Sequence, residues 1–103
     1  MFEKRFKTDI AGISHHRNAF DSLDLFKDDY AVELVEEPSN KYDPNAIKVI
    51  VDGQHIGYIP AKKCVKVKGI LHGKNVKEIR YVHNEEKLEG NIVYEDLIYI
   101  WYK

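Results

Sequence analysis

The segment from Glu36 to Pro60 constrains the fold more than any other part of the chain. Pro38 has no backbone N–H to give to a sheet, so a strand over Tyr30–Glu36 should end before it. Turn-forming residues follow, and the alternation of side chains over Ile47–Val51 then predicts a half-buried strand. Asp52-Gly53 is a two-residue hairpin turn, after which the chain returns in a further strand. This segment therefore predicts a strand, a structured loop and a β-hairpin in succession.

The loop between that strand and the hairpin carries three side chains of different chemistry, Asn40, Tyr42 and Asp43. Asn and Asp form turns by bonding nearby backbone amides, and Pro44 presets φ for a tight turn. A turn alone does not require an amide, a flat ring and a carboxylate together. Such a grouping can bind a nucleotide. In the alternative interpretation Asp43 caps its own turn and Tyr42 packs on the barrel. Residue chemistry alone favours that alternative, because Asx residues are ordinary turn formers.

Alternation with a period of two residues dominates the rest of the chain. It predicts further strands over Gln54–Ile59, Lys4–Ile13, Val76–His83 and Asn91–Tyr102, the last two flanking an acidic turn, Glu85–Gly90. Many short strands with little helix indicate a mainly β protein with one or two short helices, built as a small six-stranded β-barrel of the OB-like or SH3-like kind. The chain has 103 residues without a linker or a repeat, so we expect a single domain over residues 1–103.

Two segments have helical spacing instead. Ala61–Leu71 places Ala61, Cys64, Val67, Ile70 and Leu71 on one face, and Gly73 is a plausible stop for this helix. A short helical turn is expected within His16–Asp29. It would be capped by Asn18 and would turn Phe20, Leu23 and Phe26 toward the core.

Charge is distributed unevenly although the net charge is only −1. Asp21–Asp43 contains eight acids and two lysines, whereas Lys62–Arg80 contains seven basic residues and one acid. A basic face on a nearly neutral protein suits a limited phosphate contact, such as a short single strand or an end, and disfavours avid binding along a duplex. Lys62, Lys63 and Lys66 are the candidate phosphate contacts. The alternative interpretation is an ordinary solvated helix face.

Around the structured loop the sequence resembles the HIRAN domain family. The family pattern is an acidic-Pro pair, Asn-x-Tyr-Asp, Asn-Ala-Ile before a hydrophobic strand, and a Gly that closes the hairpin. It is matched here by Glu37-Pro38, Asn40-Lys41-Tyr42-Asp43, Asn45-Ala46-Ile47, Val49 and Gly57-Tyr58, with Ala11-Gly12-Ile13 upstream. The resemblance covers most of the chain, and the combination of motifs is more specific than any one of them.

The resemblance implies a modified OB-type barrel that holds a free 3′-hydroxyl end of single-stranded DNA, in a DNA repair or replication-fork context. Tyr42 would stack on the terminal base, Asp43 would accept a hydrogen bond from the 3′-hydroxyl, and Asn40 would bond nearby backbone or base edges. Relatives usually carry this module beside an ATP-dependent remodelling or helicase motor domain. Such a motor domain is missing from this sequence, so the resemblance implies binding without turnover. A protein partner is the expected source of any helicase or nuclease activity.

The sequence departs from the family after Gly12. Ser14 and His15 occupy positions where the family often places Arg-Tyr. The departure removes a guanidinium that would contact phosphate and exchanges a large ring for an imidazole. His15 can still stack, and Arg17 or a helix lysine can replace the charge. Ser14, His15 and Arg17 therefore complete the predicted nucleic-acid site, with DNA favoured over RNA.

No enzymatic activity, cofactor or metal is expected. The five histidines have no metal-binding spacing, the lone Cys64 has no Cys-x-x-Cys partner, and no Gly-rich phosphate loop is present. A single cysteine, no apolar run of about 20 residues and no signal peptide predict a cytoplasmic protein that does not enter the membrane. The alternative function is a non-enzymatic protein-interaction module on the same fold, docking a partner on its aromatic C-terminal strand.

Overall fold

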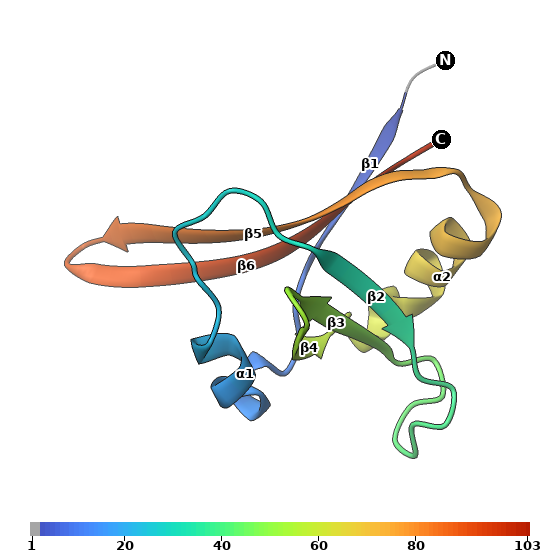
Figure 1. Cartoon of the computed structure of the whole chain (residues 1–103), viewed down its shortest axis with the longest axis horizontal. Coiled ribbons are helices and arrows are strands. Elements are labelled where there is room, and N and C mark those ends of the chain that lie inside the picture. The colour runs from blue at the N-terminus through green and yellow to red at the C-terminus, as the bar shows by residue number, and fades with distance from the viewer. Residues whose placement is uncertain (1–2) are drawn as a thin grey trace.

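Two three-stranded antiparallel sheets form the protein (Figure 1). The computed structural model describes residues 3–103. The first sheet has the order β1-β6-β5 and the second β2-β3-β4. The strands are β1 Lys4–Asp9, β2 Val32–Glu36, β3 Ile47–Val51, β4 Gln54–Tyr58, β5 Val76–Leu88 and β6 Asn91–Tyr102, and the helices are η1 Ile13–His15, α1 Arg17–Asp21, η2 Ala61–Lys63 and α2 Cys64–Gly73. The prediction of a mainly β protein is confirmed.

The β3–β4 hairpin forms as its turn chemistry predicts. Asp52 and Gly53 both have positive φ, 48° and 81°, as the favoured two-residue hairpin turn requires. The Asp52 carboxylate also accepts a hydrogen bond of 2.8 Å from the backbone N–H of Ala31, just before β2. One side chain thus closes the hairpin and fixes the entry of the neighbouring strand.

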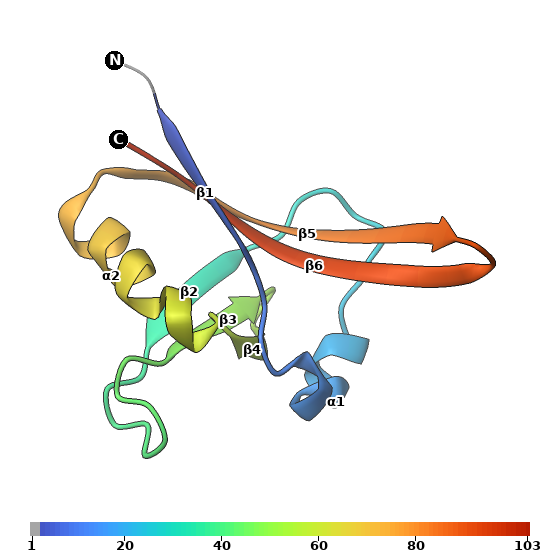
Figure 2. The same cartoon turned by 180° about the vertical axis from the view of Figure 1, so that it is seen from behind.

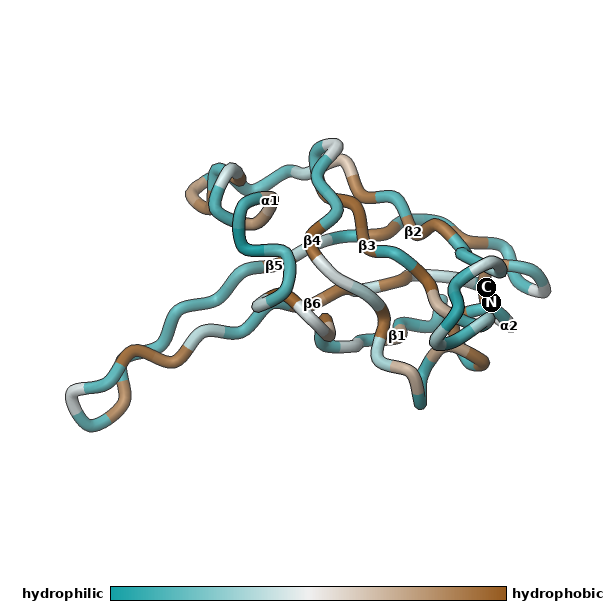
Figure 3. Tube along the Cα trace, turned by 90° about the horizontal axis from the view of Figure 1, so that it is seen from below, coloured by the Kyte–Doolittle hydropathy of each residue, from teal (hydrophilic) through white to brown (hydrophobic). Residues whose placement is uncertain are grey.

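The β5–β6 hairpin is much longer than the sequence indicates. The expected acidic turn, Glu85–Gly90, reduces to Glu89 and Gly90, which have φ values of 49° and 84°. The residues from Glu85 to Leu88 continue β5, paired with Tyr94 through Asn91 of β6. Both faces of this distal part are exposed to solvent, so no burial imposes an alternation that sequence patterning can detect. The hairpin extends beyond the other sheet (Figures 1 and 3).

The six-stranded barrel is not closed. The two sheets are joined by an isolated bridge, in which Ala11 and Tyr58 exchange backbone hydrogen bonds of 2.8 and 2.9 Å. No ladder joins β5 to β2 anywhere in residues 3–103. The loop before β2 passes β5 there, and the ring of Tyr30 meets the ring of Tyr81 edge-on, 5.0 Å between centroids. Side chains therefore fill the space where a closed barrel would have backbone pairing.

The bridge explains why residue 57 is a glycine. A Cβ at Gly57 would lie 2.5 Å from the carbonyl oxygen of Ala11 and 2.7 Å from Cγ2 of Ile10. The first of these atoms is backbone and cannot move aside without shifting the chain that leaves β1. Gly57 thus permits the close approach of β4 to the segment after β1.

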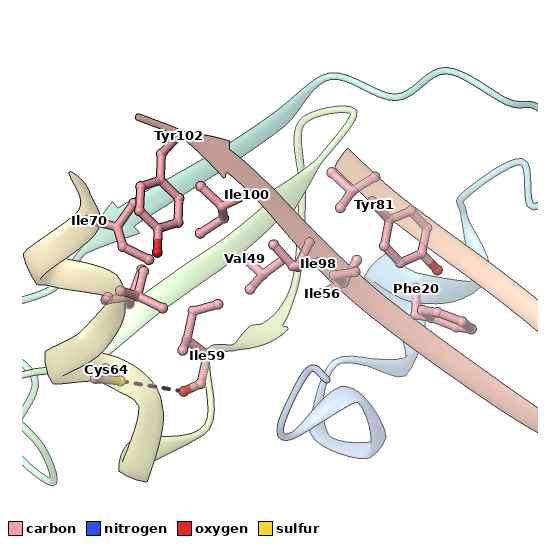
Figure 4. Packing of buried hydrophobic residues seen from close by; sticks show 13 residues of the cluster. Phe20, Val49, Ile56, Ile59, Cys64, Ile70, Tyr81, Ile98, Ile100 and Tyr102 are labelled. Carbon is pink, nitrogen blue, oxygen red and sulfur yellow. Dashed lines mark hydrogen bonds between the residues drawn. The ribbon is translucent and has the colours of Figure 1, made fainter. Parts of the chain in front are cut away.

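The core lies between the two sheets and continues onto α2 (Figure 4). Ile98, Ile100 and Tyr102 project from β6 toward Val49 of β3 and the buried face of α2. That face contains Cys64, Val67 and Ile70, as the helical spacing predicts. Burial raises the pKa of the Cys64 thiol, which lies 3.6 Å from the carbonyl oxygen of Ile59, so this cysteine belongs to the core and is not activated as a nucleophile.

The segment around α1 (Figure 2) differs from the expectation in two ways. Asn18 lies inside α1 and does not cap it; the N-cap is His16, without a side-chain bond. Phe26 is 95 % exposed, and Leu25 packs against the core in its place. The reason is local, because the Asp24 carboxylate accepts a 3.0 Å hydrogen bond from the N–H of Phe26, and this Asx turn ends the three-residue spacing. Across residues 3–103, every helix is too short or too polar to cross a membrane.

Candidate functional site

Asn40 holds the loop between β2 and β3 in one conformation. Its Oδ1 accepts hydrogen bonds from the backbone N–H groups of Tyr42 and Asp43, at 2.9 and 3.0 Å. Its Nδ2 donates a 2.6 Å bond to Oε1 of Glu37, which also accepts from the hydroxyl of Tyr58 at 3.3 Å. One amide side chain therefore joins the loop, the end of β2 and the end of β4.

Asp43 both caps its turn and keeps an oxygen free. Its Oδ1 accepts a 2.8 Å hydrogen bond from the backbone N–H of Asn45, so the capping interpretation is confirmed. Its Oδ2 has no hydrogen-bond partner within residues 3–103. Since a carboxylate can accept more than one hydrogen bond, capping and ligand binding do not exclude each other at this residue.

Tyr42 does not pack on the protein. Its side chain is 87 % exposed, and the ammonium of Lys41 lies 5.4 Å from the centre of its ring. The interpretation of Tyr42 as a packed loop residue is therefore wrong. The loop presents a large ring to solvent on a backbone that Asn40 immobilises.

A cavity of about 460 Å³ lies beside this ring. Asn40, Tyr42 and Asp43 line it together with the two bridge residues, the residues before β3 and after β4, and the start of η2: Ala11, Tyr58, Ala46, Ile59 and Ala61. Its wall is mostly aliphatic and aromatic, with the polar groups on the loop side. The structure thus brings the three predicted loop residues to one hollow, large enough for part of a nucleotide.

A cluster of three rings, which sequence reasoning missed, supports the cavity from behind Tyr58. The ring centroids of His16 and His55 are 4.3 Å apart, and those of His55 and Tyr58 are 4.9 Å apart. Within this cluster, Nε2 of His55 also lies 3.0 Å from the carbonyl oxygen of Gly57, two residues along the chain. The neighbouring pair His15-His16 was visible in the sequence, but which of the two would face Tyr58 depends on the conformation of η1.

The other predicted site residues lie elsewhere. Ser14 and His15 are exposed on η1 and do not line the cavity. Arg17 forms a 3.3 Å ion pair with Asp21 and lines a different hollow, beneath the β5–β6 hairpin. Ser14 and His15 therefore contribute no wall to the Tyr42 cavity.

The three candidate lysines differ in their surroundings. Lys62 and Lys66 are exposed, and no ion pair engages either of them within residues 3–103. Lys63 is 3.1 Å from Oδ1 of Asp9, so much of its charge is neutralised. A lysine that sequence reasoning did not select, Lys68, donates a 3.0 Å hydrogen bond to Oδ1 of Asn45 and so ties α2 to the loop.

We expect His55 and His83 to titrate on opposite sides of the ordinary histidine pKa of 6.5. Burial, and then the charge of His16, lower the pKa of His55. Burial also lowers the pKa of His83, but hydrogen bonds to Asp96 and Glu85 outweigh it, and the net pKa is raised. Imidazole chemical shifts followed by NMR across this range should show His55 deprotonating first as the pH rises. The reverse order would contradict the described geometry.

These two histidines therefore have opposite effects on stability. A lowered pKa in the folded state means that His55 contributes stability above its unfolded pKa and loses it as the pH falls. A raised pKa means that His83 contributes stability below its unfolded pKa and loses it as the pH rises through the folded value. Replacing His83 with Gln should remove the alkaline loss alone, and His55→Gln the acidic loss alone, in unfolding curves recorded across this range.

Residues 3–103 hold no group of three or more His, Cys, Asp or Glu side chains suited to a metal ion. In comparisons with known proteins, the model of the HIRAN domain family matches residues 4–102, nearly the whole chain. No curated protein and no solved structure shows significant similarity to the chain.

Proposed function

We propose that this chain, which belongs to the HIRAN domain family, binds the free 3′-hydroxyl end of single-stranded DNA in the cavity beside Tyr42. Membership of a family of DNA-binding modules supports nucleic-acid binding in general. The observation that carries the finer proposal is the exposed ring of Tyr42 beside that cavity, on a loop held by Asn40. The family is a binding domain, so the role is recognition without turnover.

The chemistry of the loop suits an end more than a continuous strand. Tyr42 offers a face on which any base can stack, without preference for sequence. The free oxygen of Asp43 can accept a hydrogen bond from a hydroxyl, whereas it repels a phosphate. Such selectivity is useful where DNA ends arise, in repair or at replication forks. A partner protein would then supply helicase or nuclease activity.

The acids at the end of β2 do not oppose this binding. Glu37 pairs with Lys48 at 3.0 Å, and hydrogen bonds from Asn40 and then from Lys48 lower its pKa. Glu36 is shared by His72 at 2.6 Å and Lys68 at 3.7 Å. Since both carboxylates are already matched, these two acids do not add an unopposed negative field beside the cavity.

Comparing the two chemical forms of one oligonucleotide tests end recognition. Replacing the 3′-hydroxyl of a labelled single strand by a 3′-phosphate should weaken binding by about tenfold, because Asp43 loses a donor and gains a repulsive neighbour. Fluorescence anisotropy at low salt measures both affinities. Asp43→Asn should narrow the difference between the two ends. Equal affinity for hydroxyl, phosphate and circular strands would contradict the proposal.

Salt dependence tests the two unpaired lysines. If Lys62 and Lys66 contact phosphates, the logarithm of the affinity for a single strand should fall with the logarithm of salt concentration, by about 0.7 per phosphate neutralised. Replacing both by Gln should make this slope shallower without changing the melting temperature. Lys63→Gln is the matched control, because that lysine is already paired with Asp9 and should change the slope less. Identical slopes in the parent protein, the double variant and Lys63→Gln would show that these lysines are solvated and do not contact phosphates.

A further inference from the structure

The distal part of the β5–β6 hairpin is a two-stranded ribbon with a free edge. The pairing of β1 with β6 ends where Asp9 meets Leu97, since the chain then turns away toward η1. From Asn91 to Asp96, β6 pairs with β5 alone, and its outer edge has no strand neighbour among residues 3–103. The ribbon stands clear of the second sheet (Figures 1 and 3). An incoming strand there would occupy the position that a longer β1 would have.

This ribbon is unusually apolar for a projecting edge. Ile92 is 54 % exposed and Tyr94 58 %, on one face, while Leu88 and Val93 are nearly half exposed on the other. Natural proteins normally avoid leaving an open strand edge with exposed apolar side chains, because such an edge pairs with other chains. The combination is therefore typical of a surface that a partner covers.

A cavity of about 370 Å³ lies under the same ribbon, against η1 and α1. Its apolar wall includes Ile13, Phe20 and Tyr94, and acids stand around it: Asp21, Glu85 and Asp96. A strand added along the free edge of β6 would direct alternate side chains toward this wall. The wall suits an apolar side chain of that strand.

The charge of the ribbon selects the class of partner. Glu85–Asp96 contains five acids and a single lysine. Within the cavity, Arg17 is already paired with Asp21 at 3.3 Å, and His83 contacts both Asp96 and Glu85, at 2.7 and 3.2 Å. The acids beyond these pairs, along the ribbon, remain uncompensated and would repel a nucleic acid. They favour a basic polypeptide.

We propose that the free edge of β6 from Asn91 to Asp96 docks an extended, basic segment of a partner protein, which adds as a strand. It places an apolar side chain against the cavity wall beside Tyr94 and turns lysine or arginine side chains toward Glu86 and Glu95 on the opposite face of the ribbon. Backbone hydrogen bonds along the edge would supply affinity, while the apolar cavity wall on one face and the unpaired acids on the other would supply selectivity. The surface is separate from the Tyr42 cavity, so a partner and a DNA end can be held at the same time.

The test uses the full chain and a fluorescein-labelled short peptide of alternating lysine and valine. We expect saturable binding by fluorescence anisotropy, and no binding of the same peptide with glutamate in place of lysine. Replacing Ile92 and Tyr94 together by serine should weaken binding by about tenfold or more, because both apolar anchors are lost. Val65→Ser, at a still more exposed apolar position on α2, is the matched control and should bind as the parent does.

Hydrogen exchange locates the contact. On peptide addition, the alternate backbone N–H groups of Asn91–Asp96 that face the free edge should become protected, while DNA binding by the double variant stays unchanged. Protection elsewhere, or unaltered affinity in the double variant, would overturn the proposal. A concentration-dependent dimer that the double variant abolishes, without peptide binding, would also overturn it by assigning the edge to a second copy of this chain.

Discussion

Replacing Ile98 with alanine should lower the free energy of unfolding by about 2–5 kcal/mol, the cost of a cavity in a well-packed core. Ile98 is fully buried, and β6 is the central strand of its sheet. It stands between Thr8 of β1 and Tyr81 of β5, both of which are also buried. Neighbours on both sides are held by sheet pairing, so they cannot collapse into the space.

Chemical denaturation followed by circular dichroism measures this loss. The midpoint should fall while the dependence on denaturant concentration stays the same, because the surface exposed on unfolding hardly changes. Ile92→Ala is the matched control, since it removes the same atoms from the same strand at a position that is mostly exposed. It should change stability by no more than about 0.5 kcal/mol. Equal losses in the two variants would contradict the position of the core.

Replacing Tyr42 with alanine should weaken the binding of single-stranded DNA by about 1–3 kcal/mol, the contribution of one stacked base. The melting temperature should stay nearly constant, because the ring is mostly exposed and the loop is held by Asn40. Tyr42→Trp should preserve binding, since stacking needs a flat ring and not the hydroxyl. Both 3′-hydroxyl and 3′-phosphate strands should lose affinity to a similar extent.

A tyrosine on the distal hairpin provides the control for this measurement. Tyr94 is also exposed, but it lies on β6 beside the other cavity. Tyr94→Ala should leave the affinity for DNA as it is in the parent protein. If Tyr42→Ala binds DNA normally, or if the two variants lose affinity equally, the cavity beside Tyr42 is not the binding site.

Much of the second sheet and its loop could be predicted from local sequence chemistry. Pro38 ends β2 and Asp52-Gly53 closes the β3–β4 hairpin through backbone preferences that act within a few residues. The bonds that Asn40 makes to the backbone of Tyr42 and Asp43 are equally local. The three loop residues of the candidate site were therefore identifiable before the chain was folded.

Sequence patterning failed at three other places. The exposed faces of the β5–β6 hairpin carry no alternation imposed by burial, so four residues of β5 were predicted to be turn. An Asx turn at Asp24 exposes Phe26 and brings Leu25 to the core, against the expected spacing. The open edge between β5 and β2 depends on how the loop before β2 packs, which periodicity does not report.

By itself the sequence determined the order of strands and helices and the rigid loop, because each of these depends on interactions between near neighbours. Only the tertiary structure decided that the rings of His16 and His55 lie against each other beside Tyr58, that Lys63 is paired with Asp9, and that β6 has a free edge above a second cavity. These features depend on contacts between residues far apart in the chain. Their geometry is set by how two twisted sheets pack, which no single segment encodes.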